Sequence, residues 1–291
     1  GRLAEAEEAC RRGLAIRTKA LGPDHLHVAY SRHNLAAILD DQGKHAEAEA
    51  EARTALEISI KAAGEDSPDT ATSLSTLAQI LKAQGRLLDA VRYAARGLAI
   101  ERKVLGDRHW KVILARQNLA TLLDDARMYK DAEPHYRDAL AAAEASGATP
   151  STLGACLGNL GLNLDAQGKG AEAEPLLRRA LDVYRKAFGD DHPATATAWA
   201  NLAVVLDRLG KHDEALAAWE DAARAEAAAR PRLGLTGGDR AQRSVPSPLP
   251  DLALALARAG RAREAWARWE QWMARGLLDD VSTRDVRPLT D

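Results

Sequence analysis

The side chains best able to do covalent chemistry are Cys10 and His33, a conceivable thiol–imidazole pair. However, packing of a helix or exposure to solvent is enough to explain why each residue stands at its position, so neither is expected to be catalytic. The eight histidines are scattered, and His25, His109 and His192 recur at matching places of an internal repeat, as scaffold residues do. No P-loop, His-Glu-x-x-His, Cys-x-x-Cys or Gly-x-Ser-x-Gly pattern occurs. The sequence therefore predicts no catalytic residue, no metal site and no cofactor.

A polar position recurs along the chain in steps of 42, 42, 41, 42 and 50 residues. A carboxamide both donates and accepts hydrogen bonds, so a row of carboxamides can hold an extended peptide backbone whatever its sequence. We therefore expect this position, called the Asn column below, to face a protein or peptide partner. Its members are Asn34, Thr76, Asn118, Asn159, Asn201 and Asp251.

The residues that follow the Asn column predict helical hairpins. The next residue is always leucine, a small residue comes after it, and a second leucine stands four positions beyond the first. Leucines at i and i+4 share one face of a helix, and the small residue lets a second helix come close. An alanine fourteen residues after the Asn column is expected at the contact with that helix: Ala48, Ala90, Ala132, Ala173, Ala215 and Ala265.

Glycines separate the predicted helices. One set ends the first helix of each hairpin, with Arg127 as the single exception: Gly43, Gly85, Gly168, Gly210 and Gly260. Another set is expected to close each second helix in a left-handed cap: Gly22, Gly64, Gly106, Gly147 and Gly189. The expected N-caps of the following helices are Asp24, Asp66, Thr149 and Asp191.

This pattern resembles tetratricopeptide repeats, and its 42-residue period is similar to that of kinesin light chains and their bacterial relatives. Typical phrases are Leu21-Gly22-Pro23-Asp24-His25 and Asn34-Leu35-Ala36. The resemblance covers residues 1 to about 275 and implies an all-α, right-handed superhelical solenoid of antiparallel helix hairpins, whose first helices line a concave groove. It further implies that the matching asparagines contact a peptide ligand, namely Asn34, Asn118, Asn159 and Asn201.

The predicted groove face extends beyond the Asn column to Tyr30, Gln79 and Thr121. First helices also end in acidic residues, among them Asp41 and Asp125, where a carboxylate opposes the helix dipole. Two alternatives stay open here. The asparagines could bond within the array rather than to a partner. The carboxylates could be offset by a basic partner segment or by nearby lysines, namely Lys44, Lys169 and Lys211.

The register divides the chain into segments. Residues 1–21 form the second helix of a repeat whose first helix is absent, so we expect a piece of a longer protein. Residues 22–230 hold five regular hairpins, and residues 231–247 form an inserted loop. Residues 248–275 form the sixth hairpin, and residues 276–291 leave the register as a C-terminal extension or linker.

Trp266, Trp269 and Trp272 stand three residues apart on the last predicted helix. Trp272 replaces a residue that is otherwise Ala or Gly, which predicts a face docked by the C-terminal tail or by a further domain. Trp269 is expected in the core because its column also holds Tyr136, Leu177 and Trp219. The stretch from Trp266 to Asp280 is similar to the segment that joins such arrays to caspase-like CHAT peptidase domains in bacterial proteins.

Composition and charge limit the class of partner. The 40 basic and 42 acidic residues give a net charge of -2, which offers no positive field for nucleic acid. The sequence has no long apolar run or signal pattern and only two cysteines, so we expect a soluble, cytoplasmic protein without membrane contact. The expected function is a non-catalytic scaffold that binds a peptide or protein surface in its groove. The alternatives are a sensor segment of a larger CHAT-type peptidase or signalling protein, and self-association through the terminal hairpins.

Overall fold

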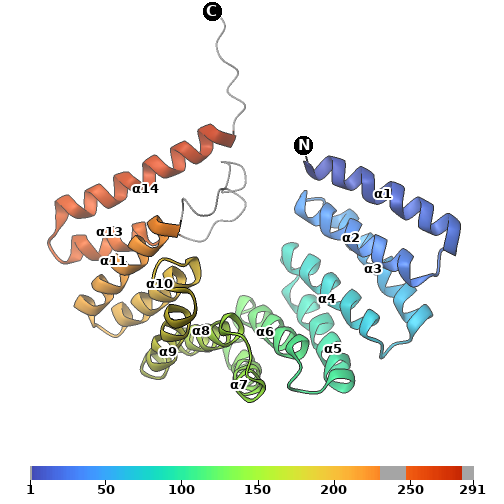
Figure 1. Cartoon of the computed structure of the whole chain (residues 1–291), viewed down its shortest axis with the longest axis horizontal. Helices are drawn as coiled ribbons and strands as arrows, with labels where there is room; N and C mark the ends of the chain where they lie inside the picture. The colour runs from blue at the N-terminus through green and yellow to red at the C-terminus, as the bar shows by residue number, and fades with distance from the viewer. Residues whose placement is uncertain (1, 230–246, 284–291) are drawn as a thin grey trace, which may run out of the picture. The chain divides into compact units, whose positions relative to one another are not determined.

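The computed structural model describes residues 2–229 and 247–283 (Figure 1). Within these ranges the chain forms thirteen helices and no strand, which confirms the predicted all-α class. The helices belong to two compact units, Gly1–Ala148 and Thr149–Asp291, which are described one at a time. The predicted loop at 231–247 lies outside the described residues except for Ser247.

The first unit consists of a single second helix followed by three hairpins. Its helices are α1 Arg2–Leu21, α2 Leu26–Asp41, α3 His45–Ala63, α4 Pro68–Ala83, α5 Leu87–Leu105, α6 Trp110–Asp125 and α7 Tyr129–Ser146. The hairpins are α2/α3, α4/α5 and α6/α7, and α1 packs on α2 (Figure 1). In addition, α3 packs on α4, and α5 packs on α6. Each of these second helices therefore lies between the first helix of its own hairpin and the first helix of the next hairpin.

The second unit repeats this arrangement. Its described helices are α8 Pro150–Ala166, α9 Gly170–Phe188, α10 Pro193–Arg208, α11 His212–Ala229, α13 Leu249–Arg258 and α14 Ala262–Thr283. The hairpins are α8/α9, α10/α11 and α13/α14, with α9 packed on α10 and α11 on α13. The last helix continues to Thr283, through the first residues of the predicted extension at 276–291.

The leucine and alanine columns form the core in both units, as the sequence predicts. All eighteen side chains of these three columns are at most 8% exposed. Burial of one leucine side chain contributes about 1.5–3 kcal/mol to stability. The small residue next to the first leucine is also buried in the first unit, as Ala36, Ala78 and Ala120 show. The core is therefore a chain of hairpin contacts rather than one central cluster.

Three of the four predicted N-caps are wrong by one residue. The helices α2, α6 and α10 are capped by His25, His109 and His192, whose Nδ1 accepts a hydrogen bond from the backbone N–H two residues on, at 3.1, 3.2 and 3.1 Å. Ser67 caps α4 and Thr149 caps α8, the latter as predicted. The aspartates stand one residue earlier, where Asp66 instead accepts a bond from Lys103 at 2.5 Å. The recurring histidines are thus structural, as their spacing indicates.

The turn glycines adopt positive φ angles. Gly147 has the predicted left-handed cap, with φ 63° and ψ 42°, whereas Gly64, Gly106 and Gly189 do not. Gly64 instead combines φ 91° with ψ 164°, a region that only glycine enters readily. Arg127, the exception in the sequence, keeps the turn geometry with φ 59° and is the one described non-glycine residue with positive φ. The turn therefore keeps its conformation at this position, but the backbone of Arg127 is strained.

Two glycines of α8 allow close packing of α9, and a third does not. A Cβ added to Gly161 would lie 2.8 Å from Cγ of Leu177, and one added to Gly154 would overlap the ring of Tyr184. A Cβ added to Gly158 would meet nothing within 4 Å. The first two glycines are therefore required by packing, whereas Gly158 only lowers helix stability.

Trp269 is not in the core, contrary to the prediction from its column. It is 41% exposed, whereas Tyr136, Leu177 and Trp219 are at most 5% exposed. In the other hairpins this position is covered by neighbouring helices. Within the described residues α14 packs extensively on α13 alone, so nothing described covers the outer side of Trp269.

We expect Arg127→Gly to raise the free energy of unfolding by about 0.5–1 kcal/mol, because glycine has no Cβ to strain at positive φ. Urea unfolding followed by circular dichroism measures the change. The reciprocal variant Gly85→Arg, at φ 76° in the same unit, should lower stability by a similar amount. A less stable Arg127→Gly variant would contradict the strain argument.

The glycines of α8 offer a matched pair of substitutions. Gly158→Ala should raise the melting temperature, because alanine is favoured over glycine in a helix by about 0.5–1 kcal/mol. Gly161→Ala should lower it, because the overlap with Leu177 costs about 1–3 kcal/mol and exceeds that gain. Thermal unfolding of both variants decides the matter. Equal effects of the two substitutions would show that α9 can move aside.

Candidate functional site

The Asn column lies on the first helices with its side chains at least partly open to solvent. Asn34 and Asn118 are exposed, and Thr76, Asn159 and Asn201 are half-buried. The Thr76 hydroxyl is 2.8 Å from Nδ1 of His33, and Asn159 also interacts within the chain. The alternative of bonding within the array therefore holds for these two members. Within the described residues Asn34, Asn118 and Asn201 make no side-chain hydrogen bond.

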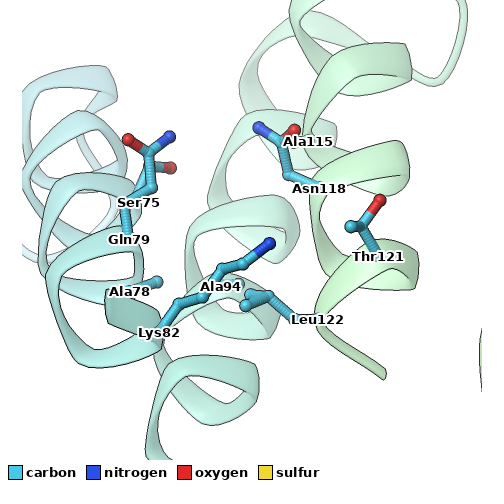
Figure 2. Close-up of a pocket in the computed structure, with 9 residues that line it drawn as sticks. All are labelled: Ser75, Ala78, Gln79, Lys82, Ala94, Ala115, Asn118, Thr121 and Leu122. Carbon is cyan, nitrogen blue, oxygen red and sulfur yellow. The ribbon is translucent and has the colours of Figure 1, made fainter. Parts of the chain in front are cut away.

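One pocket of the first unit gathers several of the predicted groove residues. It lies between α4, α5 and α6 and has a volume of about 340 Å³. Figure 2 shows the side chains of Gln79 on α4 and Asn118 on α6 on opposite sides, with the Lys82 amine between the helices. We call it the groove pocket, and its lining is Ser75, Ala78, Gln79, Lys82, Ala94, Ala115, Asn118, Thr121 and Leu122.

The groove pocket has an apolar part and a polar part. Ala78, Ala94, Ala115 and Leu122 supply hydrocarbon surface. The carboxamides of Gln79 and Asn118 make no hydrogen bond to any described residue, so both can donate and accept. An extended backbone segment of a partner would offer them matching N–H and C=O groups.

Two polar side chains of the pocket already have partners. The Thr121 hydroxyl donates to the backbone carbonyl of Gln117 at 2.9 Å and lies 3.2 Å from the Tyr136 hydroxyl. Lys82 Nζ lies 2.8 Å from an Asp125 carboxylate oxygen. Both partners of that ion pair are exposed, so it contributes at most about 1 kcal/mol and leaves Lys82 free to exchange Asp125 for a ligand group.

Other predicted groove residues lie outside this pocket. The Tyr30 hydroxyl donates to Asp69 at 2.5 Å, and this hydrogen bond raises the pKa of Tyr30. Asn34 and Asp41 are exposed on α2 and do not line the pocket. The structure thus brings together Gln79, Asn118 and Thr121, with Asp125 adjacent through Lys82.

A second pocket of the same kind lies between α10, α11 and α13, but its volume is only about 120 Å³. It occupies the same register as the groove pocket, since its wall includes Val204 in the place of Gln79 and Asp251 in that of Asn118. The floor is Trp219, which stands where the groove pocket has Ala94, eighteen residues after the Asn column. Trp219 therefore occupies space in this pocket that Ala94 leaves open in the groove pocket.

The carboxylates at the first-helix C-termini are offset by cations other than the predicted lysines. Asp207 lies 2.9 Å from His212 and 2.8 Å from Arg258, and these contacts, His212 first, lower the pKa of Asp207. Asp165 pairs with Arg208, and Asp125 pairs with Lys82. The prediction is wrong for two lysines, because Lys44 pairs with Glu7 at 2.9 Å and Lys211 with Glu174 at 2.8 Å. Arg258, Arg208 and Lys82 reach these carboxylates from neighbouring hairpins, whereas His212 reaches Asp207 from beyond the turn of its own hairpin.

The tryptophans of α14 form an exposed apolar face. Trp266, Trp269 and Trp272 are 64%, 41% and 37% exposed, and the rings of Trp269 and Trp272 are 5.0 Å apart. The Trp266 indole donates to Glu270 at 2.7 Å. The predicted docking at this face stays a prediction, since the side chains from residue 275 onward are not described.

Lys82 and Ala94 line the groove pocket but escaped the sequence analysis as site residues. The signal for Ala94 was available, because its column changes from alanine in the first two hairpins to larger residues later: Ala52, Ala94, Tyr136, Leu177, Trp219 and Trp269.

Among the described residues no group of three His, Cys, Asp or Glu side chains could hold a metal ion. Nor is any helix of the described ranges long and apolar enough to cross a bilayer.

Comparison with known proteins identifies the repeat. The tetratricopeptide repeat family model matches residues 1–61, 41–103, 69–145 and 152–225. Tetratricopeptide repeat protein 19, mitochondrial, from Danio rerio is 41% identical over 64 residues, which are 20% of this chain and 16% of that protein. The chain thus spans about a sixth of the length of this curated relative.

Solved structures share the fold at low identity. A kinesin light chain candidate from Podosopora anserina with nearly identical TPR-like repeats has a TM-score of 0.63 at 22% identity, covering 76% of this chain and 99% of that one. BtubC (BKLC) from P. vanneervenii has a TM-score of 0.64 at 21% identity, covering 80% and 91%. A Rap protein complexed with Competence and Sporulation Factor has a TM-score of 0.56 at 15% identity, covering 96% and 87%. The family model matches most of the length of this chain, and the solved structures share its fold. The chain therefore belongs to the tetratricopeptide repeat family.

Proposed function

We propose that this chain is a non-catalytic interaction scaffold that holds a peptide or protein segment at the groove pocket of its first unit. One observation carries the proposal: the carboxamides of Gln79 and Asn118 face an open pocket without a partner among the described residues. Buried carboxamides are normally bonded within the fold, whereas Gln79 and Asn118 are exposed and can exchange water for the polar groups of a ligand. These two are held by rigid helices and left available.

The pocket suits an extended segment with one side chain turned inward. Gln79 and Asn118 can bond the segment's backbone from two helices, which fixes its direction. The methyl groups of Ala78, Ala94 and Ala115 then receive the inward side chain. Ligand sites of this kind combine apolar walls with a few placed polar groups.

The first unit is favoured over the second as the site of binding. In the second unit Trp219 fills the corresponding floor, and the pocket keeps about a third of the volume, 120 against 340 Å³. Its walls also carry Asp207, Arg208 and Arg258, which are engaged in ion pairs with Asp165 or with each other. A neutral backbone segment gains less there, because it must displace charges from their partners.

The fold is compatible with such a role. A Rap protein of this fold has been solved complexed with Competence and Sporulation Factor. The alternatives from the sequence, a sensor segment of a CHAT-type peptidase and self-association through terminal hairpins, stay predictions. So do the bacterial origin and the cytoplasmic location.

The proposal predicts that peptides selected from a random display library on the wild-type protein depend on the groove pocket. The double variant Gln79→Ala, Asn118→Ala should bind them at least about tenfold more weakly, since each lost hydrogen bond costs about 1 kcal/mol. Its melting temperature should change little, because neither carboxamide bonds within the fold. Calorimetric titration of the selected peptides measures the affinities.

A filled pocket provides a second test of the same site. Ala94→Tyr places in the floor the side chain that Tyr136 carries at the same register, so the variant should fold and lose peptide affinity. Asn201→Ala, a change in the same column of the second unit, is the matched control and should bind normally. Peptides that bind both first-unit variants normally and lose affinity for Asn201→Ala would overturn the assignment.

A further inference from the structure

The second unit contains a charged pocket that shares no lining residue with either pocket described above. It lies where the α9–α10 connection meets α11 and has a volume of about 340 Å³. We call it the edge pocket, and it is lined by Arg185, Asp190, Asp191, Trp199, Asp221, Arg224 and Ala225.

The first unit holds four of these seven side-chain types at the same register. Counted from the Asn column, Arg185, Asp190 and Asp221 of the edge pocket correspond to three residues beside Asn118, namely Arg102, Asp107 and Asp138. Asp191, Trp199 and Arg224 differ, because the first unit has Arg108, Arg116 and Ala141 there. The difference on which the comparison turns lies two residues before the column. There the first unit has Arg116, and the edge pocket has Trp199.

In the first unit Arg116 occupies this place. Its guanidinium is only 4% exposed and donates to the Asp107 carboxylate at 2.6 Å and to the Asp107 carbonyl at 3.2 Å. The same guanidinium lies 3.7 Å from the carboxylate of Asp138. Arg102 approaches Asp107 from the other side at 2.8 Å. The protein therefore builds a guanidinium site between two aspartates and fills it with its own arginine.

In the second unit the two aspartates remain, Trp199 stands in place of Arg116, and Arg224 supplies a guanidinium that the first unit lacks. Arg185 still bonds Asp190, at 2.6 Å, and Asp221 pairs with Arg224 on its own helix. The Trp199 ring lies beneath the Arg185 guanidinium, whose central carbon is 5.7 Å from the ring centroid. Both arginines are largely exposed, so each aspartate can share its carboxylate with a further guanidinium.

We propose that the edge pocket binds an arginine side chain of a partner protein, with its guanidinium in the place that Arg116 takes in the first unit. A planar guanidinium can donate to two carboxylates in its own plane while its face stacks on an aromatic ring. Asp190 and Asp221 supply the carboxylates, and Trp199 supplies the ring.

This site is separate from the groove pocket in chemistry and position along the chain. The groove pocket offers neutral carboxamides on α4 and α6, whereas the edge pocket offers carboxylates on the α9–α10 connection and α11 and an indole on α10. Binding at the edge pocket does not depend on the function proposed for the groove pocket, and either can fail alone.

The test uses the whole chain and the tripeptide acetyl-Gly-Arg-Gly-amide as probe. The Trp199 indole N–H signal in a proton–nitrogen NMR spectrum, assigned through Trp199→Phe, reports occupation of the edge pocket. We expect a saturable shift with a dissociation constant on the order of millimolar, as suits one guanidinium in a solvent-accessible site. The lysine tripeptide should bind several times more weakly, and the isosteric neutral citrulline tripeptide should give no saturable shift.

Two variants separate specific binding from general charge attraction. Trp199→Arg restores the side chain found in the first unit, so it should fold with an unreduced melting temperature and bind the arginine tripeptide at least about tenfold more weakly, monitored through the remaining shifted signals of α10 and α11. Asp221→Asn should weaken binding in the same direction while keeping Trp199 as the probe. Asp138→Asn, the same substitution at the matching position of the first unit, is the control and should bind as the wild type does.

Three results would overturn the proposal. One is the absence of a saturable Trp199 shift at tens of millimolar tripeptide. Another is equal binding of the citrulline and arginine tripeptides, which would show that charge plays no part. The third is unchanged arginine affinity in Asp221→Asn, which decides the question even if Trp199→Arg does not fold.

Discussion

The structure depends on one repeated contact, between a first helix and the second helix that follows it. Leucine pairs such as Leu35 and Leu39 enter this contact, and an alanine such as Ala48 allows the helices to approach. Because each hairpin packs only on its neighbours, the same contact must form in every repeat for the array to hold. These columns are therefore fixed, and the chain can vary only at positions beside them.

Both candidate sites arise at such variable positions. Eighteen residues after the Asn column, Ala94 leaves a pocket open and Trp219 narrows the corresponding one. Two residues before the column, Arg116 fills a charged site and Trp199 leaves its counterpart open. In each case a side chain at one register position differs in size or charge between two repeats, among other differences in the lining, so one repeat shows what can occupy the space in the other. Matching positions in different repeats can therefore be compared directly to infer what a given pocket accommodates.

The sequence predicts the parts of this fold that depend on local patterns. The hairpins, the core columns and the turn at Arg127 follow from periodicity and from the spacing of glycines. The cap residues were missed because the next residue, His25, Ser67 or His192, accepts the bond expected of the aspartate before it, and nothing in the spacing distinguishes the two. Trp269 was wrongly predicted to be buried. Burial of this position depends on the next helix packed against it, and the residue types at the position do not show whether such a helix follows. Ion pairs such as Lys82–Asp125 join different hairpins, so their partners depend on side-chain reach rather than on register.

The two proposed sites would respond differently to solution conditions. Hydrogen bonds between carboxamides such as Asn118 and a peptide backbone involve no net charge, so salt would affect such binding little. A guanidinium held by Asp190 and Asp221 would be attracted by charge, and screening over about 8–10 Å at physiological ionic strength would weaken that attraction. The dependence of binding on salt therefore distinguishes a ligand of the edge pocket from a ligand of the groove pocket.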